Sequence, residues 1–207
     1  MEAVPVTQEP VPDRLRAAAL ELFASKGFGP VSIREIADRA GFTSAVLYHY
    51  YASKEHLYQA ILEDRIVALH GRLALANDLS LEPDARIEAV CRAFLEHFRD
   101  EGTGGRFVLR ELLGLGAEKF KTMVESRDAQ TRSYFRHALL EGMETGLFLR
   151  VDSTMCSMSI SAIVNSFARR WALGATFSLE DALAQITKSY LRGLRTTPDG
   201  TNLAMGD

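Results

Sequence analysis

The sequence predicts an all-α fold in which a short N-terminal unit of three helices is followed by a longer helical region. Two observations support this prediction. Apolar residues recur every three or four positions through most of the 207 residues, which is the spacing of the buried face of a helix. The alternation of apolar and polar residues that is typical of a half-buried strand does not compete with this pattern in any segment.

The composition is that of a soluble globular protein, with 47% hydrophobic residues, 25% charged residues and a net charge of −3. No apolar run reaches the roughly 18 residues that a membrane-spanning helix needs. Residues 1–12 contain three prolines and no lysine or arginine, so we expect a disordered tail rather than a signal peptide. These features predict a cytoplasmic protein that has no membrane partner.

The first helix is expected to begin at an Asp13 cap and to end at Gly27, because leucine, alanine and phenylalanine residues recur at helical spacing between them. Ser32 and Glu35 have the spacing of a capping box, which predicts the start of a second helix that ends before Gly41. Thr43 is expected to cap the third helix. The second and third helices are joined by the Gly41 turn and form, together with the first, a helix-turn-helix unit.

The third helix is expected to bury Val46, Leu47 and Tyr50 and to expose the rest of its surface. A short helix with small residues at its start fits the major groove of DNA. Hydroxyl and methyl groups at its N-terminus suit base edges, whereas the aromatic side chains one turn later suit phosphates. The residues expected on the exposed face are Thr43, Ser44, Ala45, Tyr48 and His49. Tyr48 as a core aromatic and His49 as an ordinary surface histidine remain alternatives.

Ser53 is expected to cap a fourth helix whose first residue is Lys54. A lysine beside the free amides of a helix N-terminus predicts a phosphate clamp. The charge balance gives little support to DNA binding, since residues 13–58 hold six lysines and arginines against five acids. Affinity for DNA therefore has to come from the placement of charges, from helix N-termini and from dimerisation.

The N-terminal motifs resemble those of the tetracycline-repressor (TetR) family over roughly residues 13–60. The resemblance rests on Gly27-Phe28, the Ser32–Ala37 run, Ala40-Gly41-Phe42, the Leu47–Tyr51 run and the Ser53–Leu57 run, with Phe42 replacing the more common valine and Tyr51 the typical phenylalanine. It implies a homodimeric, ligand-responsive regulator, commonly a repressor, that binds a palindromic operator in double-stranded DNA. Carried onto this chain, it implies DNA contacts by Ser32, Arg34, Thr43, Ser44, Ala45, Tyr48, His49 and Lys54.

The region after the head is expected to be entirely helical. The predicted helices cover approximately residues 54–75, 84–100, 107–115, 120–145, 153–173 and 178–194, with a flexible loop at 101–105. Small residues mixed with methionine and isoleucine in residues 155–166 favour close helix packing, so residues 153–194 are expected to form a homodimer surface. Intramolecular core packing is the alternative.

A cavity for a small-molecule effector of unknown identity is plausible among the middle helices, where methionine and aromatic residues are frequent. The candidate lining residues are Phe94, Phe98, Phe107, Arg110, Tyr134, Asn165, Arg169 and Trp171. Ordinary core packing is the alternative for each. An arginine that faces the cavity without a partner would favour an acidic effector.

The chain has no motif for catalysis, metal binding or a cofactor. Its five histidines are scattered, and the loop at 102–105 lacks the lysine of a phosphate-binding loop. Cys91 and Cys156 have no paired spacing, so we interpret them as structural thiols, with a redox sensor as the alternative. The sequence therefore predicts a non-enzymatic protein. It comprises a DNA-binding head (13–58), a ligand-binding and dimerisation body (59–196) and a disordered tail (197–207). A small-molecule sensor or carrier that has lost specific DNA binding is the alternative.

Overall fold

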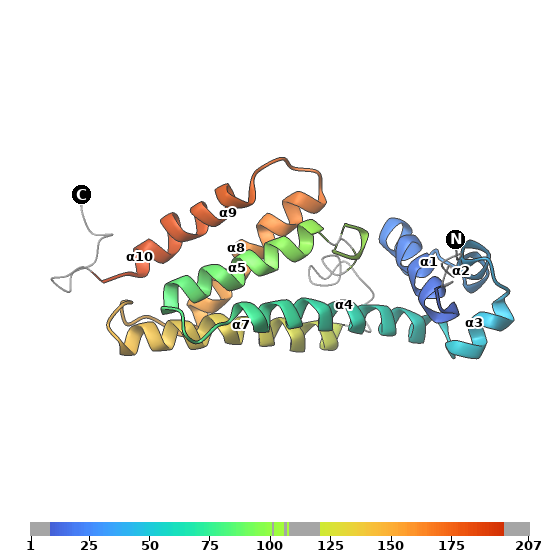
Figure 1. Ribbon diagram of the computed structural model, residues 1–207, viewed down its shortest axis with the longest axis horizontal. Helices are drawn as coiled ribbons and strands as arrows, with labels where there is room; N and C mark the ends of the chain where they lie inside the picture. Colours follow the sequence, from blue (N-terminus) through green and yellow to red (C-terminus); the bar gives the residue numbers. More distant parts are fainter. Residues whose placement is uncertain (1–8, 101, 106, 108–120, 197–207) are drawn as a thin grey trace, which may run out of the picture.

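The computed structural model describes residues 9–100, 102–105, 107 and 121–196. Within these ranges the regular secondary structure is helical, apart from an isolated bridge between Phe148 and Arg195. The molecule is elongated, with a small three-helix head at one end and a larger helical body at the other (Figure 1). The head contains α1 (Val11–Lys26), α2 (Ile33–Ala40) and α3 (Ser44–Tyr50). This arrangement confirms the predicted all-α fold with an N-terminal helix-turn-helix.

The helix starts in the head are determined by local hydrogen bonds. Side-chain oxygens of Ser32, Thr43 and Ser53 accept hydrogen bonds from the amides of the residues three positions later, at 3.1, 3.4 and 3.1 Å. Each bond satisfies an amide that has no partner inside the helix, so the predicted caps are confirmed. The start of α1 differs from the prediction. The helix begins at Val11, and Asp13 in its first turn accepts a hydrogen bond from Arg16 at 2.7 Å instead of capping the helix.

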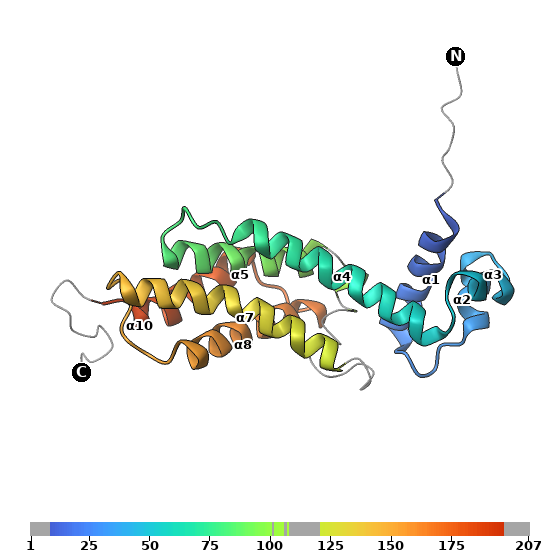
Figure 2. The same ribbon diagram turned by 90° about the horizontal axis from the view of Figure 1, so that it is seen from below.

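One continuous helix, α4 (Lys54–Ala76), runs from the head into the body (Figure 2). The predicted boundary between residues 58 and 59 therefore falls inside a helix rather than in a linker. In the body, α5 (Pro83–Asp100) is central, because it packs against α4, α7 (Lys121–Glu144), α8 (Ser153–Ala172) and α9 (Leu179–Ile186). Of the helix predicted at 107–115, all but Phe107 lies outside the described residues.

The helix predicted at 178–194 is divided into three parts. It begins as predicted, with the Ser178 hydroxyl accepting a hydrogen bond from the Asp181 amide at 3.0 Å. After α9 the helix continues as one π-helical segment, Thr187–Leu191, and finishes with a short α10 (Arg192–Leu194). Backbone hydrogen bonds then join this end to the turn before α8, from Leu149 to Leu194 at 2.8 Å and from Thr196 to Leu147 at 3.1 Å.

A buried arginine joins α5 to α7 at the end of the body distant from the head. Arg86 is 1% exposed, and its Nη2 donates to Glu141, while its Nε and Nη1 are buried without a partner among the described residues. Removing the acid from a buried pair leaves an uncompensated charge, whereas an apolar residue of similar length removes the charge itself. We expect Glu141→Gln to lower the free energy of unfolding by about 1–2 kcal/mol, since Glu141 is partly solvated, and Arg86→Met to be tolerated. Urea denaturation of both variants checks this. An Arg86→Met variant less stable than Glu141→Gln would contradict it.

Candidate nucleic-acid interface and effector site

Helix α3 presents most of its surface to solvent. Leu47 is its one fully buried residue, while Tyr48 and Tyr50 are 55% and 42% exposed. Thr43, Ala45 and His49 are also exposed, and Ser44 is half-buried. The rings of His49 and Tyr50 meet edge to face with their centroids 4.9 Å apart. The outer face of α3 therefore combines small residues at its start with three consecutive aromatic residues at its end.

The prediction that Tyr50 lies in the core is wrong. α3 ends at Tyr50, and Tyr51 follows in an extended conformation, which turns its ring inward to 6% exposure. Because the chain leaves helical geometry after Tyr50, the buried ring at the end of α3 is that of Tyr51 and not that of Tyr50. Tyr50 is thus a surface aromatic that the sequence analysis missed.

Three helix N-termini in the head carry hydroxyl residues at their caps: Ser32, Thr43 and Ser53. Each cap uses an oxygen lone pair as acceptor, so the O–H donor stays available for a phosphate oxygen. Arg34, in the first turn of α2, is almost fully exposed, and its Nε lies 3.7 Å from Asp38 in a loose surface pair. Its guanidinium therefore remains accessible to a further anion.

The contacts of Lys54 within the head give no support to the phosphate clamp predicted for it. Its Nζ donates to the carbonyl oxygens of Phe28, Gly29 and Val31 at 2.9, 3.2 and 2.8 Å. The ammonium also lies 4.3 Å from the centroid of the Phe28 ring. An ammonium has three N–H donors, and all three are engaged by the loop between α1 and α2. Lys54 thus stabilises the head from within.

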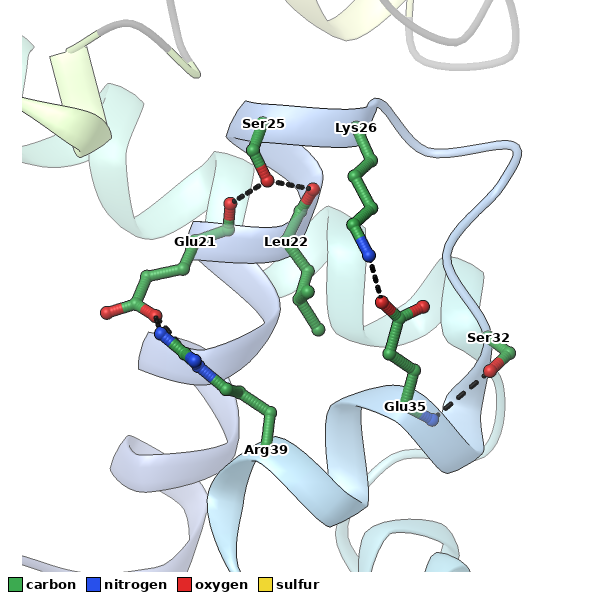
Figure 3. A network of polar contacts seen from close by, with 7 residues as sticks. All are labelled: Glu21, Leu22, Ser25, Lys26, Ser32, Glu35 and Arg39. Carbon is green, nitrogen blue, oxygen red and sulfur yellow. Dashed lines mark hydrogen bonds and ion pairs between the residues drawn. The ribbon is translucent and has the colours of Figure 1, made fainter.

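Other cations of the head are paired with acids (Figure 3). Lys26 forms an ion pair with Glu35, and Arg39 pairs with Glu21 at 2.6 Å, so two ion pairs join α1 to α2. The hydrogen bond from Lys26 lowers the pKa of Glu35, and the Ser32 backbone amide lowers it further. These two of the six cationic side chains of the head are therefore paired with acids of the head itself.

Arg16 joins α1 to α4. Its guanidinium lies 2.7 Å from Asp13 and 3.2 Å from Asp64. The hydrogen bond to Asp13 raises the pKa of Arg16, with smaller contributions from nearby groups that include Asp64. The pair lies at the rim of a groove of about 330 Å³ between the two helices. This contact adds to the packing that determines how the head meets the long helix.

An aromatic cluster connects the head to the body. The rings of Phe23, Phe28 and Tyr58 lie mutually 4.8–5.7 Å apart, and Tyr58 also meets Phe107 edge to face at 5.0 Å. The cluster brings together α1, the loop after it, α4 and the segment that follows α5. Phe107 thus contacts the helix that leads into the head. Edge-to-face pairs at these distances are favourable beyond the area they bury.

Besides Phe107, which is buried in the core, four further predicted effector residues lie in or beside the core of the body. Phe94 and Phe98 of α5 are buried with their ring centroids 4.8 Å apart, and Tyr134 of α7 is half-buried. Asn165 of α8 has a buried Oδ1 that finds no hydrogen-bond partner among the residues that the structure describes. A buried amide oxygen without a partner is unfavourable, so it is a natural acceptor for a donor on a bound molecule.

The other predicted effector residues are placed differently. Arg169 is exposed. The Trp171 indole stacks on Phe177 at 4.9 Å, and its Nε1 donates to the Phe177 carbonyl at 3.1 Å, which closes the turn between α8 and α9. Arg110 lies outside the described residues. These positions remove the support for an acidic effector that an unpaired Arg169 would have given.

The described residues hold no group of histidine, cysteine or acidic side chains arranged to bind a metal ion. In the same part of the chain, no helix combines the length and apolarity that a membrane crossing requires. Both cysteines are free thiols, and burial raises the pKa of the Cys91 thiol above its usual range. A buried thiol of raised pKa is poorly reactive.

Two family models match the chain. Residues 15–61 match the model described as bacterial regulatory proteins, tetR family. Residues 80–194 match the model of the tetracyclin repressor-like C-terminal domain, and this match covers more than half of the 207 residues. The chain belongs to the TetR family. This membership confirms the resemblance derived from the head and extends it to the body.

This TetR-family chain is similar to named regulators. The HTH-type transcriptional repressor KstR2 of Mycolicibacterium smegmatis is 29% identical over 136 residues, which are 66% of each protein. The HTH-type transcriptional regulatory protein RaaS of Mycobacterium tuberculosis is 47% identical over 136 residues, which are 59% of this chain and 64% of RaaS. The chain thus matches slightly less than two thirds of the length of these relatives. AibR, solved with isovaleryl coenzyme A and operator DNA, shares the fold with a TM-score of 0.73 at 21% identity over 87% of this chain and 97% of AibR.

Proposed function

We propose that this TetR-family chain is a transcriptional repressor that binds a palindromic operator as a homodimer and is released by a small-molecule effector. The observation that carries the proposal is the outer face of α3, a short helix at the tip of the molecule with one fully buried residue. The naming of KstR2 as a repressor supports the direction of regulation. A cytoplasmic location follows from this function.

The proposed base contacts come from the start of α3, where Thr43, Ser44 and Ala45 allow a close approach to base edges. The proposed phosphate contacts come from Tyr48, His49 and Tyr50 at its end. Ser32 and Arg34 at the start of α2 add a hydroxyl donor and an accessible guanidinium. Lys54 is not part of this set.

The proposed dimer forms through residues 153–194. Met155 and Met158 on α8 are 61% and 49% exposed, which is unusual for large apolar side chains close together on one helix. Pairing of two copies along this face would place both α3 helices on the same side of a duplex. Half-sites about one helical turn apart, about 34 Å, are then expected.

The proposed effector binds in the body, near Phe94, Phe98, Tyr134 and Asn165. Aromatic surroundings and a buried amide acceptor favour a largely apolar molecule with at least one hydrogen-bond donor. A change at Phe107 would reach α4 through Tyr58 and alter the angle of the head. The change in operator affinity equals the difference in effector affinity between the two head positions.

The decisive experiment is selection from random double-stranded DNA with purified protein, scored for an enriched palindrome. We expect Ala45→Leu to weaken binding to the selected operator about tenfold or more, because a larger side chain separates α3 from the base edges. Ala74→Leu on the exposed face of α4 is the matched control and should bind as wild type. Both affinities are measured by fluorescence anisotropy at one fixed salt concentration.

If Ala45→Leu and Ala74→Leu bind the operator with equal affinity, α3 does not contact the base edges. If a folded wild-type dimer enriches no sequence at low salt, the head does not bind DNA specifically. A sensor or carrier without specific DNA binding then becomes the better interpretation, and a screen of apolar small molecules by thermal shift would follow.

A further inference from the structure

We infer that Arg14 is a positioning residue that sets the angle of α3 by holding the turn between α2 and α3, with Phe42 as its partner. This inference rests on the proposed DNA-binding function and assigns a role to a residue that is not expected to touch bases. It also assigns a role to Phe42, whose ring lies under the Arg14 guanidinium.

Helix α3 needs an anchor beyond its own packing. It has seven residues, of which Leu47 alone is fully buried. Its connection to α2 is held by two backbone hydrogen bonds, from Gly41 to Asp38 at 3.2 Å and from Phe42 to Ala37 at 2.8 Å. A short helix with so little buried surface can change its angle at low energetic cost unless the turn before it is held.

Arg14 supplies this hold from α1. Its Nη2 donates to the carbonyl oxygen of Ala40, the last residue of α2, at 2.8 Å. Its guanidinium carbon lies 4.5 Å from the centroid of the Phe42 ring. A cation at a helix C-terminus interacts favourably with the unpaired carbonyls there, and a guanidinium stacks well on an aromatic face. The same side chain thus contacts the residues immediately before and after Gly41.

The turn is shaped to admit this side chain. Gly41 has a φ of 77°, and a Cβ added there would lie 3.2 Å from Arg14 Nη2. Positive φ already favours glycine at this position. The guanidinium therefore crosses the turn close to the space that a side chain at position 41 would need, so any rotation of α3 about the turn changes its contacts.

The effect on DNA binding should be selective. Base contacts need the correct angle of α3, whereas the proposed phosphate contacts of α2 do not depend on it. If the correct angle is only fractionally populated, the apparent affinity for operator falls by that fraction. Loss of Arg14 should therefore reduce operator binding more than binding to unrelated DNA.

The test compares wild type with Arg14→Met, Arg14→Lys, Phe42→Val and the Arg14→Met/Phe42→Val double variant. Affinity for the selected operator and for an unrelated duplex of equal length is measured across a salt series. We expect Arg14→Met and Phe42→Val each to lower the ratio of the two affinities about fivefold to tenfold. The double variant should be no worse than either single variant. Arg14→Lys should recover part of the loss, because lysine keeps the charge but not the planar stack.

Additive losses of operator affinity in the double variant would overturn the inference, and so would full recovery of that affinity in Arg14→Lys. An equal loss of affinity for both duplexes, with a salt slope reduced by about one, would also overturn it, because that result indicates a phosphate contact. Hydrogen exchange of the α3 amides gives a second readout that needs no DNA. It should accelerate in Arg14→Met relative to wild type while α1 and α4 stay protected, and unchanged α3 exchange would contradict the role. If wild type selects no operator, the proposed function fails while this readout still decides the role of Arg14.

Discussion

Replacing Lys54 with methionine is expected to lower the free energy of unfolding by about 3 kcal/mol and to leave the salt dependence of DNA binding unchanged. The ammonium donates to three carbonyls of one short loop and lies over the Phe28 ring. Hydrogen bonds that involve a charged group contribute about 1.5–3 kcal/mol each, but the loop is partly exposed and water replaces some of them. Methionine keeps the length and apolar stem of the side chain and removes the donors.

Lys26→Met is the matched control. Its pair with Glu35 lies on the surface, and such pairs contribute about 1 kcal/mol or less. Guanidinium denaturation gives both stabilities, and operator titrations between low and moderate salt give the slopes. A Lys54→Met protein of wild-type stability whose salt slope falls by about one would restore the phosphate clamp and refute the internal role.

Replacing Gly142 with alanine is expected to lower the free energy of unfolding by about 2 kcal/mol, although alanine is the better helix former. Gly142 lies within α7, and a Cβ there would be 2.2 Å from Cδ2 of the Phe148 ring. Phe148 is buried and its amide donates to the Gly142 carbonyl at 2.9 Å, so the ring has no free space into which to move. The overlap therefore outweighs the gain in helix propensity.

Gly71→Ala gives the opposite expectation within the same chain. Gly71 lies in α4, and a Cβ there meets nothing within 4 Å, so the variant should gain about 0.5–1 kcal/mol. Thermal and urea unfolding of both variants measure the difference. A Gly142→Ala protein at least as stable as Gly71→Ala would show that the turn before α8 can move away from α7. The double variant Gly142→Ala/Phe148→Leu should recover stability if the ring is the obstacle.

The features that the sequence predicted correctly are local. The caps at Ser32, Thr43, Ser53 and Ser178 and the length of α4 follow from residues within one or two helical turns. Each of these features depends on backbone amides that lack a partner and on apolar spacing, and both are visible in a single segment. The fold class and the position of the candidate interface followed from them.

The predictions that the structure does not support concern contacts between segments. Lys54 was assigned to phosphate from its place at a helix start, but its partners come from a loop more than 20 residues earlier. Trp171 was assigned to the effector site from its size, but its partner is the turn six residues later. Tyr50 was assigned to the core, but it is exposed, and the buried ring belongs to Tyr51 just after the end of α3. Spacing along one helix carries no information about these neighbours.

The internal pairing of cations in the head has a consequence for how the protein would search a genome. A bacterial chromosome offers about 10⁶ or more competing sites, and non-specific binding comes mainly from unpaired positive charge. Because Lys26, Arg39 and Arg16 are paired with acids, the head presents less unpaired charge to random sequence than its six cations would alone. A smaller share of the molecules is then sequestered away from the operator, so few copies would suffice to occupy it.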